Sequence, residues 1–572
     1  MKIHRSSDDV TITRLVPLFI VLFLISFISG NYYFQGDAYQ SYPRGFYAGD
    51  AYFDLLRIDH IREVGNLNYQ PKVLVAFRPE PFTTHDSPVM YYSASWFADV
   101  FGLESHVAVH VLMVFALLME IAVVFVLLSR VNWVLAWLSL PFSLAALQLP
   151  FISGINWGLW KAYYSFYIFF LLALFYPIRL DWRAIFCYSL VFSSLILAYP
   201  FDGIYALVLL AFSLAVSRVD GFGSKVLKFL AVGIISSLLF VNYFMDYISG
   251  FYPQSPGGLN PGFLLSMLGS EVYRLPYFAE SGIYNLGIWF WISLLGFGLT
   301  IFLLVKDWKK IDRYPNKLLA VFSIIYFFYF LEPYFPRLMK FRDTWPIMIG
   351  VFVGCFLYLL LVAVFSKGSR NGRSQAEFET LGYITFIILM GVFLGTYFKL
   401  PDESESVVSK DLYSAHMYLK DKSLKNATVL LIDPFQDQDV DTLLSGRNVR
   451  YLTQQSFKNL SSLGYDLSAV PTSRFCAFPI WLRQGFRIIE YNVSGSLCQD
   501  RFIKPCQNDY VIMNMHYNSS EEWAQNWPRE GYDTLQILLQ RLLADGSFTI
   551  INSTKTTYVL KNNRSCGSWA AD

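Results

Sequence analysis

Apolar runs of about 20 residues recur along the first 400 residues of this chain, and they limit its fold more than any other feature. Hydrophobic residues make up 55% of the sequence and charged residues 15%, a balance that a soluble protein does not reach. Runs of this length predict membrane-spanning helices, about eleven in all. They lie near residues 13–31, 107–129, 132–153, 162–178, 184–200, 203–217, 226–246, 286–305, 317–332, 344–366 and 380–398. The sequence therefore predicts a polytopic α-helical membrane protein.

The charges beside the apolar runs predict how the chain is oriented. The first run is too long, and too poorly supplied with a small-residue cleavage site, to be a signal peptide. Its flank carries Lys2, Arg5 and Arg14, which place the N-terminus in the cytoplasm by the positive-inside rule. An odd number of spans then places the C-terminal part outside. We predict a transmembrane domain over 1–400, with a large first outer loop over 32–105, and an extracytoplasmic domain over 401–572.

The predicted outer domain has the sequence pattern of a mixed α/β fold. Residues 533–544 predict an amphipathic helix, and the last two predicted strands form a hairpin. No glycine-rich phosphate loop follows any strand, and the net charge is only +2, so neither a nucleotide site nor a nucleic-acid partner is indicated. The predicted strands are 427–433, 448–452, 486–491, 510–513, 548–551 and 557–560.

Cysteines and glycosylation sequons also point to an outer location for this domain. Cys187 and Cys355 fall within predicted spans and are expected to be inert apolar residues. The disulfide candidates are Cys476, Cys498, Cys506 and Cys566, for which three pairings are possible. Asn-x-Ser/Thr sequons begin at Asn426, Asn459, Asn492, Asn518, Asn552 and Asn563. Together these residues predict a disulfide-bonded, N-glycosylated domain at an archaeal cell surface or in a eukaryotic endoplasmic reticulum lumen.

The segment 49–65 follows the first apolar run and predicts a short helix beside the membrane. Asp50 lies at its start, where a helix N-terminus favours an ionised carboxylate. A carboxylate at a membrane surface is a candidate general base for a lipid-linked substrate. The structural alternative is an acidic N-cap with an Asp54–Arg57 pair at i,i+3. Asp37 belongs to an earlier copy of the same Gly-Asp-Ala-Tyr sequence.

The sequence Asp-Ala-Tyr-x-x-Leu-Leu-Arg-Ile, just after a first membrane helix, resembles the first outer loop of GT-C membrane glycosyltransferases. It is most similar to the archaeal oligosaccharyltransferase branch, where Asp-x-Tyr opens an amphipathic helix and the aspartate is catalytic. The resemblance implies a catalytic role for Asp50, assisted by Asp54, and substrate contacts for Tyr52 and Arg57. Asp50 is preferred to Asp37 because only Asp50 precedes Leu-Leu-Arg. An archaeal cell membrane is favoured over the endoplasmic reticulum because the resemblance is closest to the archaeal branch.

A predicted outer loop at 332–343 carries three cations, Arg337, Lys340 and Arg342, against the usual charge rule. They suggest a bound anion, and the resemblance implies the phosphate of a lipid-linked donor. The alternatives are a lipid-headgroup anchor or pairing with neighbouring carboxylates.

Other predicted site residues rest on shorter patterns. Glu271 resembles the acid of a late outer-loop motif in oligosaccharyltransferases, although a Glu271–Arg274 pair explains it as well. His85 and Asp86 precede a proline step into a helix, as in many GT-C members, or simply form a turn. Trp157 and Trp160 are predicted to stack on sugars, or belong to an interfacial aromatic belt.

Two departures from the oligosaccharyltransferase pattern shape the predicted function. The stretch 153–162 lacks the metal-binding acidic pair and carries Lys161 instead, and no Trp-Trp-Asp-Tyr-Gly sequence follows the last span. The sequence therefore predicts an inverting glycosyltransferase that uses a polyprenyl- or dolichyl-phosphate sugar, a glycan or protein acceptor and no required cofactor. The alternatives are an oligosaccharyltransferase-like enzyme with a divalent metal, and a non-enzymatic transporter or scaffold for surface glycan assembly.

Overall fold

The computed structural model describes residues 49–65, 88–147, 155, 158–239, 287–331, 344–368 and 375–396. In the C-terminal part it describes 410–424, 427–433, 447–452, part of 460–467, 472–475, 481–484, 487–490, 497–500, 507–515, 530–544 and 546–563. The chain forms two compact units. The helical unit comprises Met1–Asp37 and Asp86–Asp402, and the mixed unit comprises Ala38–His85 and Glu403–Asp572.

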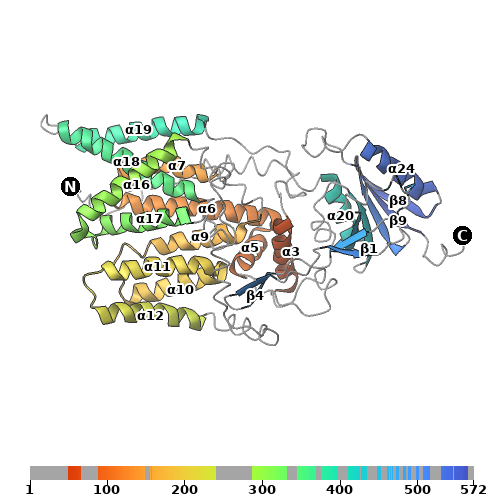
Figure 1. Cartoon of the computed structure of the whole chain (residues 1–572), viewed down its shortest axis with the longest axis horizontal. Coiled ribbons are helices and arrows are strands. Elements are labelled where there is room, and N and C mark those ends of the chain that lie inside the picture. Colours follow the sequence, from red (N-terminus) through yellow and green to blue (C-terminus); the bar gives the residue numbers. More distant parts are fainter. Residues whose placement is uncertain are drawn as a thin grey trace. The chain divides into compact units, whose positions relative to one another are not determined.

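The described part of the helical unit consists of helices that run beside one another (Figure 1). They are α5 (Pro88–Phe101), α6 (Ser105–Ser129), α7 (Trp133–Ser143), η1 (Leu144–Leu147), α9 (Trp160–Ala173), α10 (Trp182–Ala198), α11 (Pro200–Val216), α12 (Phe222–Leu239), α16 (Ile288–Lys306), η3 (Trp308–Lys310), α17 (Tyr314–Leu331), α18 (Trp345–Gly368) and α19 (Gln375–Thr396). Each predicted span from 107 onward contains one of these helices. The first predicted span, 13–31, lies outside the described residues.

Among the described helices, α6, α12, α16 and α18 are long and apolar enough to cross a membrane. A mostly helical, polytopic membrane fold is thereby supported, and the number of eleven spans stays a prediction.

The predicted span 132–153 is divided in the structure. Pro141 lies inside α7, and the chain tightens into the 3-10 turn η1 directly after that helix. Proline removes one helical hydrogen bond, which accounts for an end of regular α-helix nearby.

Small residues allow α7 and α18 to pack at close range. Gly350 and Gly354 of α18 are one helical turn apart and face Ser139 and Ser143 of α7. The Ser143 hydroxyl donates to the backbone carbonyl of Ile347 at 3.3 Å, across the helix interface. Without a hydrophobic driving force between lipid-embedded helices, such close packing and hydrogen bonding stabilise their association.

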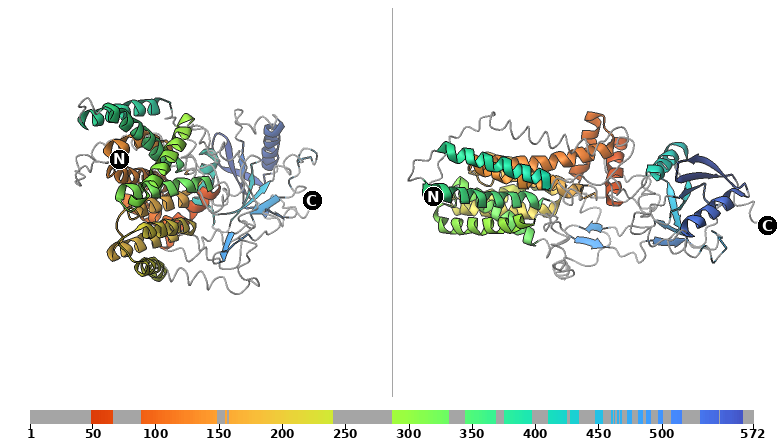
Figure 2. Two further views of the ribbon diagram at one scale, coloured as in Figure 1. Left: turned by 60° about the vertical axis from the view of Figure 1, so that its left-hand side comes forward. Right: turned by 90° about the horizontal axis from the view of Figure 1, so that it is seen from above.

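The mixed unit is built on a seven-stranded sheet of order β6-β3-β2-β1-β7-β9-β8, seen from two sides in Figure 2. Its central strands β2, β1 and β7 are parallel, and the outer pairs are antiparallel. The strands are β1 (Thr428–Ile432), β2 (Asn448–Leu452), β3 (Thr472–Phe475), β6 (Leu497–Asp500), β7 (Tyr510–Asn514), β8 (Phe548–Ser553) and β9 (Thr557–Asn562), with β4 (Trp481–Gln484) and β5 (Arg487–Glu490) forming a separate two-stranded sheet.

Helices α3 (Gly49–Val64), α20 (Lys410–Lys422) and α24 (Glu530–Ala544) complete the described part of the mixed unit. Leucines of α24 share a hydrophobic core with β1, β7 and β9. The six predicted strands, the hairpin of β8 with β9 and the helix α24 are confirmed. The sequence did not predict β3, β4, β6 or α20. The sequences of these three strands, TSRF, WLRQ and LCQD, lack the runs of β-branched and aromatic residues that indicate a strand.

Candidate active site

Helix α3 places Asp50 in its first turn, because the helix begins one residue earlier at Gly49. The backbone N–H groups of a first turn have no helical acceptor and favour a nearby carboxylate. Asp50 is therefore helical rather than at the N-cap position that the sequence suggested. The helix ends at Val64. Gly65 follows it with a φ of +83°, which suits glycine, and its N–H donates to the Ile61 carbonyl at 2.6 Å. The side chains of Asp50 and Tyr52 lie outside the described part.

Asp54 belongs to the buried side of α3, together with Ala51, Ile58 and Ile61. Only 3% of Asp54 is exposed, and its Oδ1 accepts from Arg57 Nη1 at 2.9 Å. The i,i+3 pair predicted as the structural alternative is thus present. The catalytic role of Asp54 and the substrate contact of Arg57 stay predictions.

The beginning of α9 is tied to α5 and to the beginning of α11. Tyr164 of α9 donates to Ser93 of α5 at 2.8 Å, and Lys161 Nζ lies 5.5 Å from the ring centroid of Tyr91. Farther along α9, the Ser165 hydroxyl donates to the Asp202 carboxylate in the first turn of α11. Ser165 and Asp202 are both buried. These contacts fix the start of α9, on the side that the predicted topology places outside.

Sequence reasoning missed Asp202, although a signal was present. Pro200 begins α11 and an acid follows within the first turn, a usual helix start. The two predicted spans end at 200 and begin at 203, so Asp202 falls in the two-residue gap between them. Trp160, predicted to stack on a sugar, is fully buried, and its Nε1 donates to the Ile155 carbonyl at 2.6 Å. Its sugar-binding role stays a prediction.

The residues that flank the predicted phosphate-binding loop are joined to each other. Tyr329, near the end of α17, and Thr344, before α18, are linked by a hydroxyl–hydroxyl hydrogen bond of 2.8 Å. The Tyr329 ring also stacks on Trp345, with 5.4 Å between ring centroids. The two ends of segment 332–343 are therefore held close together. The cations Arg337, Lys340 and Arg342 themselves lie outside the described residues.

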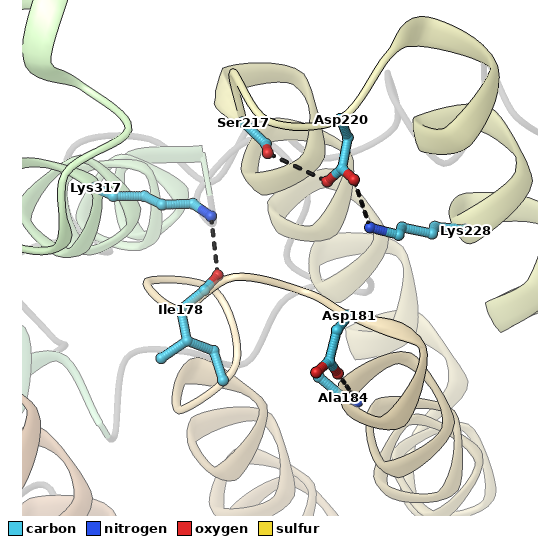
Figure 3. A network of polar contacts seen from close by, with 7 residues as sticks. All are labelled: Ile178, Asp181, Ala184, Ser217, Asp220, Lys228 and Lys317. Carbon is cyan, nitrogen blue, oxygen red and sulfur yellow. Dashed lines mark hydrogen bonds and ion pairs between the residues drawn. The ribbon is translucent and has the colours of Figure 1, made fainter.

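Charged side chains near the opposite ends of α9 and α11, from α12, α17 and the loop after α11, bind to the protein itself (Figure 3). Asp220 accepts from Lys228 Nζ at 2.8 Å and from Ser217 at 3.2 Å. The bond from Lys228 is the main reason that the pKa of Asp220 lies below its usual value. Lys317 Nζ donates to the Ile178 carbonyl at 3.2 Å, just beyond the end of α9. These contacts close the helix turns on the predicted cytoplasmic side.

Several predicted residues lie where the structure gives no side-chain geometry. Two of the predicted sequon asparagines are described: Asn552 is half-buried in β8, and Asn563 is exposed. The N-glycosylation and the disulfide bonds stay predictions. The described residues contain no group of three potential metal ligands. Outside the described part lie Asp37, His85, Asp86, Trp157, Glu271, Cys476, Cys506, Cys566, Asn426, Asn459, Asn492 and Asn518, and only the backbone of Cys498 in β6 is described.

No family model and no curated protein matches this sequence, but solved structures resemble it. ArnT from Cupriavidus metallidurans bound to undecaprenyl phosphate is 12% identical, with a TM-score of 0.51 over 97% of this chain and 99% of that chain. Its apo state gives 13% identity and a TM-score of 0.48 over 96% and 98%. The apo oligosaccharyltransferase of Archaeoglobus fulgidus gives 12% and 0.44 over 90% of this chain and 72% of that chain.

At such low identity the resemblance concerns the fold alone. The likeness to ArnT supports a fold shared with that protein over nearly the whole of both chains.

Proposed function

We propose that this chain is a GT-C glycosyltransferase that transfers a sugar from a polyprenyl phosphate to an acceptor on the outer face of the membrane. The observation that carries the proposal is the fold likeness to ArnT, which extends over 97% of this chain. The ArnT structure contains undecaprenyl phosphate, a lipid of the proposed donor class. The acidic first turn of α3 supports the same reading, because it offers a carboxylate at a helix N-terminus.

The proposed reaction is a single displacement at the anomeric carbon of the sugar. The acceptor oxygen forms a bond to that carbon while the carbon–oxygen bond to phosphate breaks, and the phosphate keeps the electron pair. The acceptor proton passes to the carboxylate of Asp50, which acts as general base. The configuration at the anomeric carbon inverts. Arg337, Lys340 and Arg342 are proposed to stabilise the charge that develops on the leaving phosphate.

Asp50→Asn tests the proposal, because it keeps the shape of the side chain and removes the proton acceptor. We expect the rate of sugar transfer from polyprenyl phosphate to fall about 100- to 10,000-fold, the usual contribution of a general base. Asp37→Asn should have a smaller effect. Glu63→Gln is the matched control, since Glu63 is an exposed acid at the other end of the same helix. The three variants are compared as purified full-length proteins with a labelled sugar donor, in the presence and absence of a chelator.

Two results would contradict these assignments. Near-wild-type turnover in Asp50→Asn together with loss in Asp37→Asn would move the base to Asp37. Full activity in both variants would remove the catalytic role of this loop.

A further inference from the structure

The turns after α6, α9, α11 and α16 meet at the predicted cytoplasmic end of the helical unit. Tyr314, at the start of α17, donates to the Leu127 carbonyl near the end of α6 at 3.3 Å. One turn farther along α17, Lys317 donates to the Ile178 carbonyl beyond α9 at 3.2 Å (Figure 3). The last turns of α11 and α16 pack with Ile311 and α17 in one hydrophobic cluster. Charges on four separate turns are thereby brought to one surface.

This surface has more exposed cations than acids. The described acids of these turns already have partners in the protein. Asp181 caps α10, and its Oδ1 accepts from the next turn at 2.8 Å. The carboxylates of Asp220, Asp307 and Asp312 each lie within 4.0 Å of a lysine or arginine. The exposed cations of these turns, which we call the cation surface, are Arg130, Arg179, Arg183, Arg218, Lys306, Lys309, Lys310 and Arg313.

Some of these cations are not used by the protein itself. The side chains of Arg183, Lys309 and Arg313 make no hydrogen bond or ion pair within the described part of the chain. They come from three different turns, at the start of α10, in η3 and before α17. Their charges are therefore free to bind an anion from outside the protein.

Large apolar side chains are exposed beside the cations. Trp182, next to Arg183, is 51% exposed, and Trp308, next to Lys309, is 56% exposed. Phe222 at the start of α12 is 84% exposed. Tryptophan among lysine and arginine is typical of the boundary between lipid and water. The exposed cations thus lie at the level where phospholipid headgroups are found.

We propose that the cation surface binds the headgroups of anionic phospholipids in the cytoplasmic leaflet. Guanidinium and ammonium groups form charge-assisted hydrogen bonds with phosphate oxygens. A cluster of lysines and arginines directly cytoplasmic of membrane helices is attracted to an anionic leaflet. The acids of the same turns do not compete, since each is engaged within the protein. The inference goes beyond the proposed function, because it concerns bound lipid and needs no sugar transfer.

The combined variant Arg183→Gln, Lys309→Gln and Arg313→Gln tests the inference. Affinity of the purified full-length protein is measured for phosphatidylglycerol and for phosphatidylcholine with the same acyl chains. Affinity for phosphatidylglycerol should fall about fivefold for each cation, and thus about 100-fold for the three. Affinity for the zwitterionic phosphatidylcholine should not change. Added salt should weaken phosphatidylglycerol binding by wild type, because it screens exposed charges.

The matched control removes three exposed lysines from the mixed unit, with Lys420→Gln, Lys555→Gln and Lys561→Gln. It changes the net charge by the same amount and should bind phosphatidylglycerol like wild type. Arg183→Lys should also keep most of the affinity, because the charge remains. Thermal unfolding without added lipid checks folding. Should the combined variant unfold early, the three single variants carry the same comparison at about fivefold each.

Wild-type affinity for phosphatidylglycerol in the combined variant would overturn the inference. Equal losses in the combined variant and its control would assign the effect to net charge, and equal losses for both lipids would assign it to apolar contacts. Displacement of phosphatidylglycerol by an equal concentration of inorganic phosphate would assign the surface to soluble anions. Lipid binding is measured without a sugar donor, so a failure of the proposed transferase does not affect this result.

Discussion

Replacing Gly350 by alanine should separate α7 from α18 and destabilise the helical unit. A methyl group at Gly350 would meet the Ser143 backbone nitrogen at 2.6 Å and the Ser139 carbonyl oxygen at 2.7 Å. Both are backbone atoms, so no change of rotamer relieves the contact. Ordinary van der Waals separation requires the two helices to move apart locally by roughly 0.8 Å. The Ser143–Ile347 hydrogen bond, already 3.3 Å long, would be lost in that movement.

The expected magnitude follows from two opposing effects. Overpacking of a tightly packed interior costs about 1–3 kcal/mol, and the higher helix propensity of alanine offsets about 1 kcal/mol. Gly350→Ala should therefore lower the free energy of unfolding by up to about 2 kcal/mol. Gly354→Ala should cost less, because its nearest neighbour is the rotatable hydroxyl of Ser139. Gly233→Ala is the control, since no atom lies within 4 Å of a methyl group there. It should be neutral or slightly stabilising.

The assay is the thermal unfolding midpoint of the purified full-length protein in one detergent, with all variants measured side by side. We expect the order Gly233→Ala, Gly354→Ala, Gly350→Ala from most to least stable. Ser139→Gly should restore stability to Gly354→Ala but not to Gly350→Ala, because only the former contact is with the Ser139 side chain. A Gly350→Ala protein as stable as Gly233→Ala would refute the close packing of α7 on α18.

Two further predictions concern groups outside the membrane helices. Arg447→Met should destabilise the mixed unit by about 2 kcal/mol, measured by denaturant unfolding. The buried guanidinium of Arg447 donates to backbone carbonyl groups at the end of α20 and to that of Ser423, the latter at 2.9 Å, and the substitution removes these bonds. Asp220→Asn should lower stability at neutral pH. Because the folded-state pKa of Asp220 is depressed, its contribution is present above the unfolded value of about 3.9 and is lost as pH falls through the lower, folded value. Unfolding midpoints of wild type and Asp220→Asn should thus differ above about pH 5 and converge in acid.

Features set by neighbouring residues were the ones that the sequence predicted well. The apolar runs predicted the helices from α6 to α19, and the i,i+3 spacing of Asp54 and Arg57 predicted their ion pair. Helix α20 was predictable by the same rule. Four of its residues are buried and follow helical spacing: Leu412, Ala415, His416 and Leu419. They lie just beyond the polar linker in which the sequence predicts the domain boundary.

Contacts between distant segments could not be predicted from spacing. Gly350 and Gly354 are visible as a pair of small residues in one helix, but nothing local shows that Ser139 and Ser143 are their partners. Ser143 is 204 residues from its hydrogen-bond acceptor Ile347. Such partnerships depend on which helices pack together, and a sequence of nearly uniform hydrophobicity does not encode that choice in any single segment.

The same limit applies to the start of α9, whose partners the local sequence does not show. Lys161 lies over the ring of Tyr91 in α5, and the Ser165–Asp202 bond joins two residues that are 37 positions apart. At the other ends of these helices, Asp220 and Lys228 neutralise each other and Lys317 binds a main-chain carbonyl. Paired charges there stabilise the turns. At the start of α9, Tyr164 bonds to Ser93 and Ser165 bonds to Asp202, so contacts with α5 and α11 fix that end of the helix.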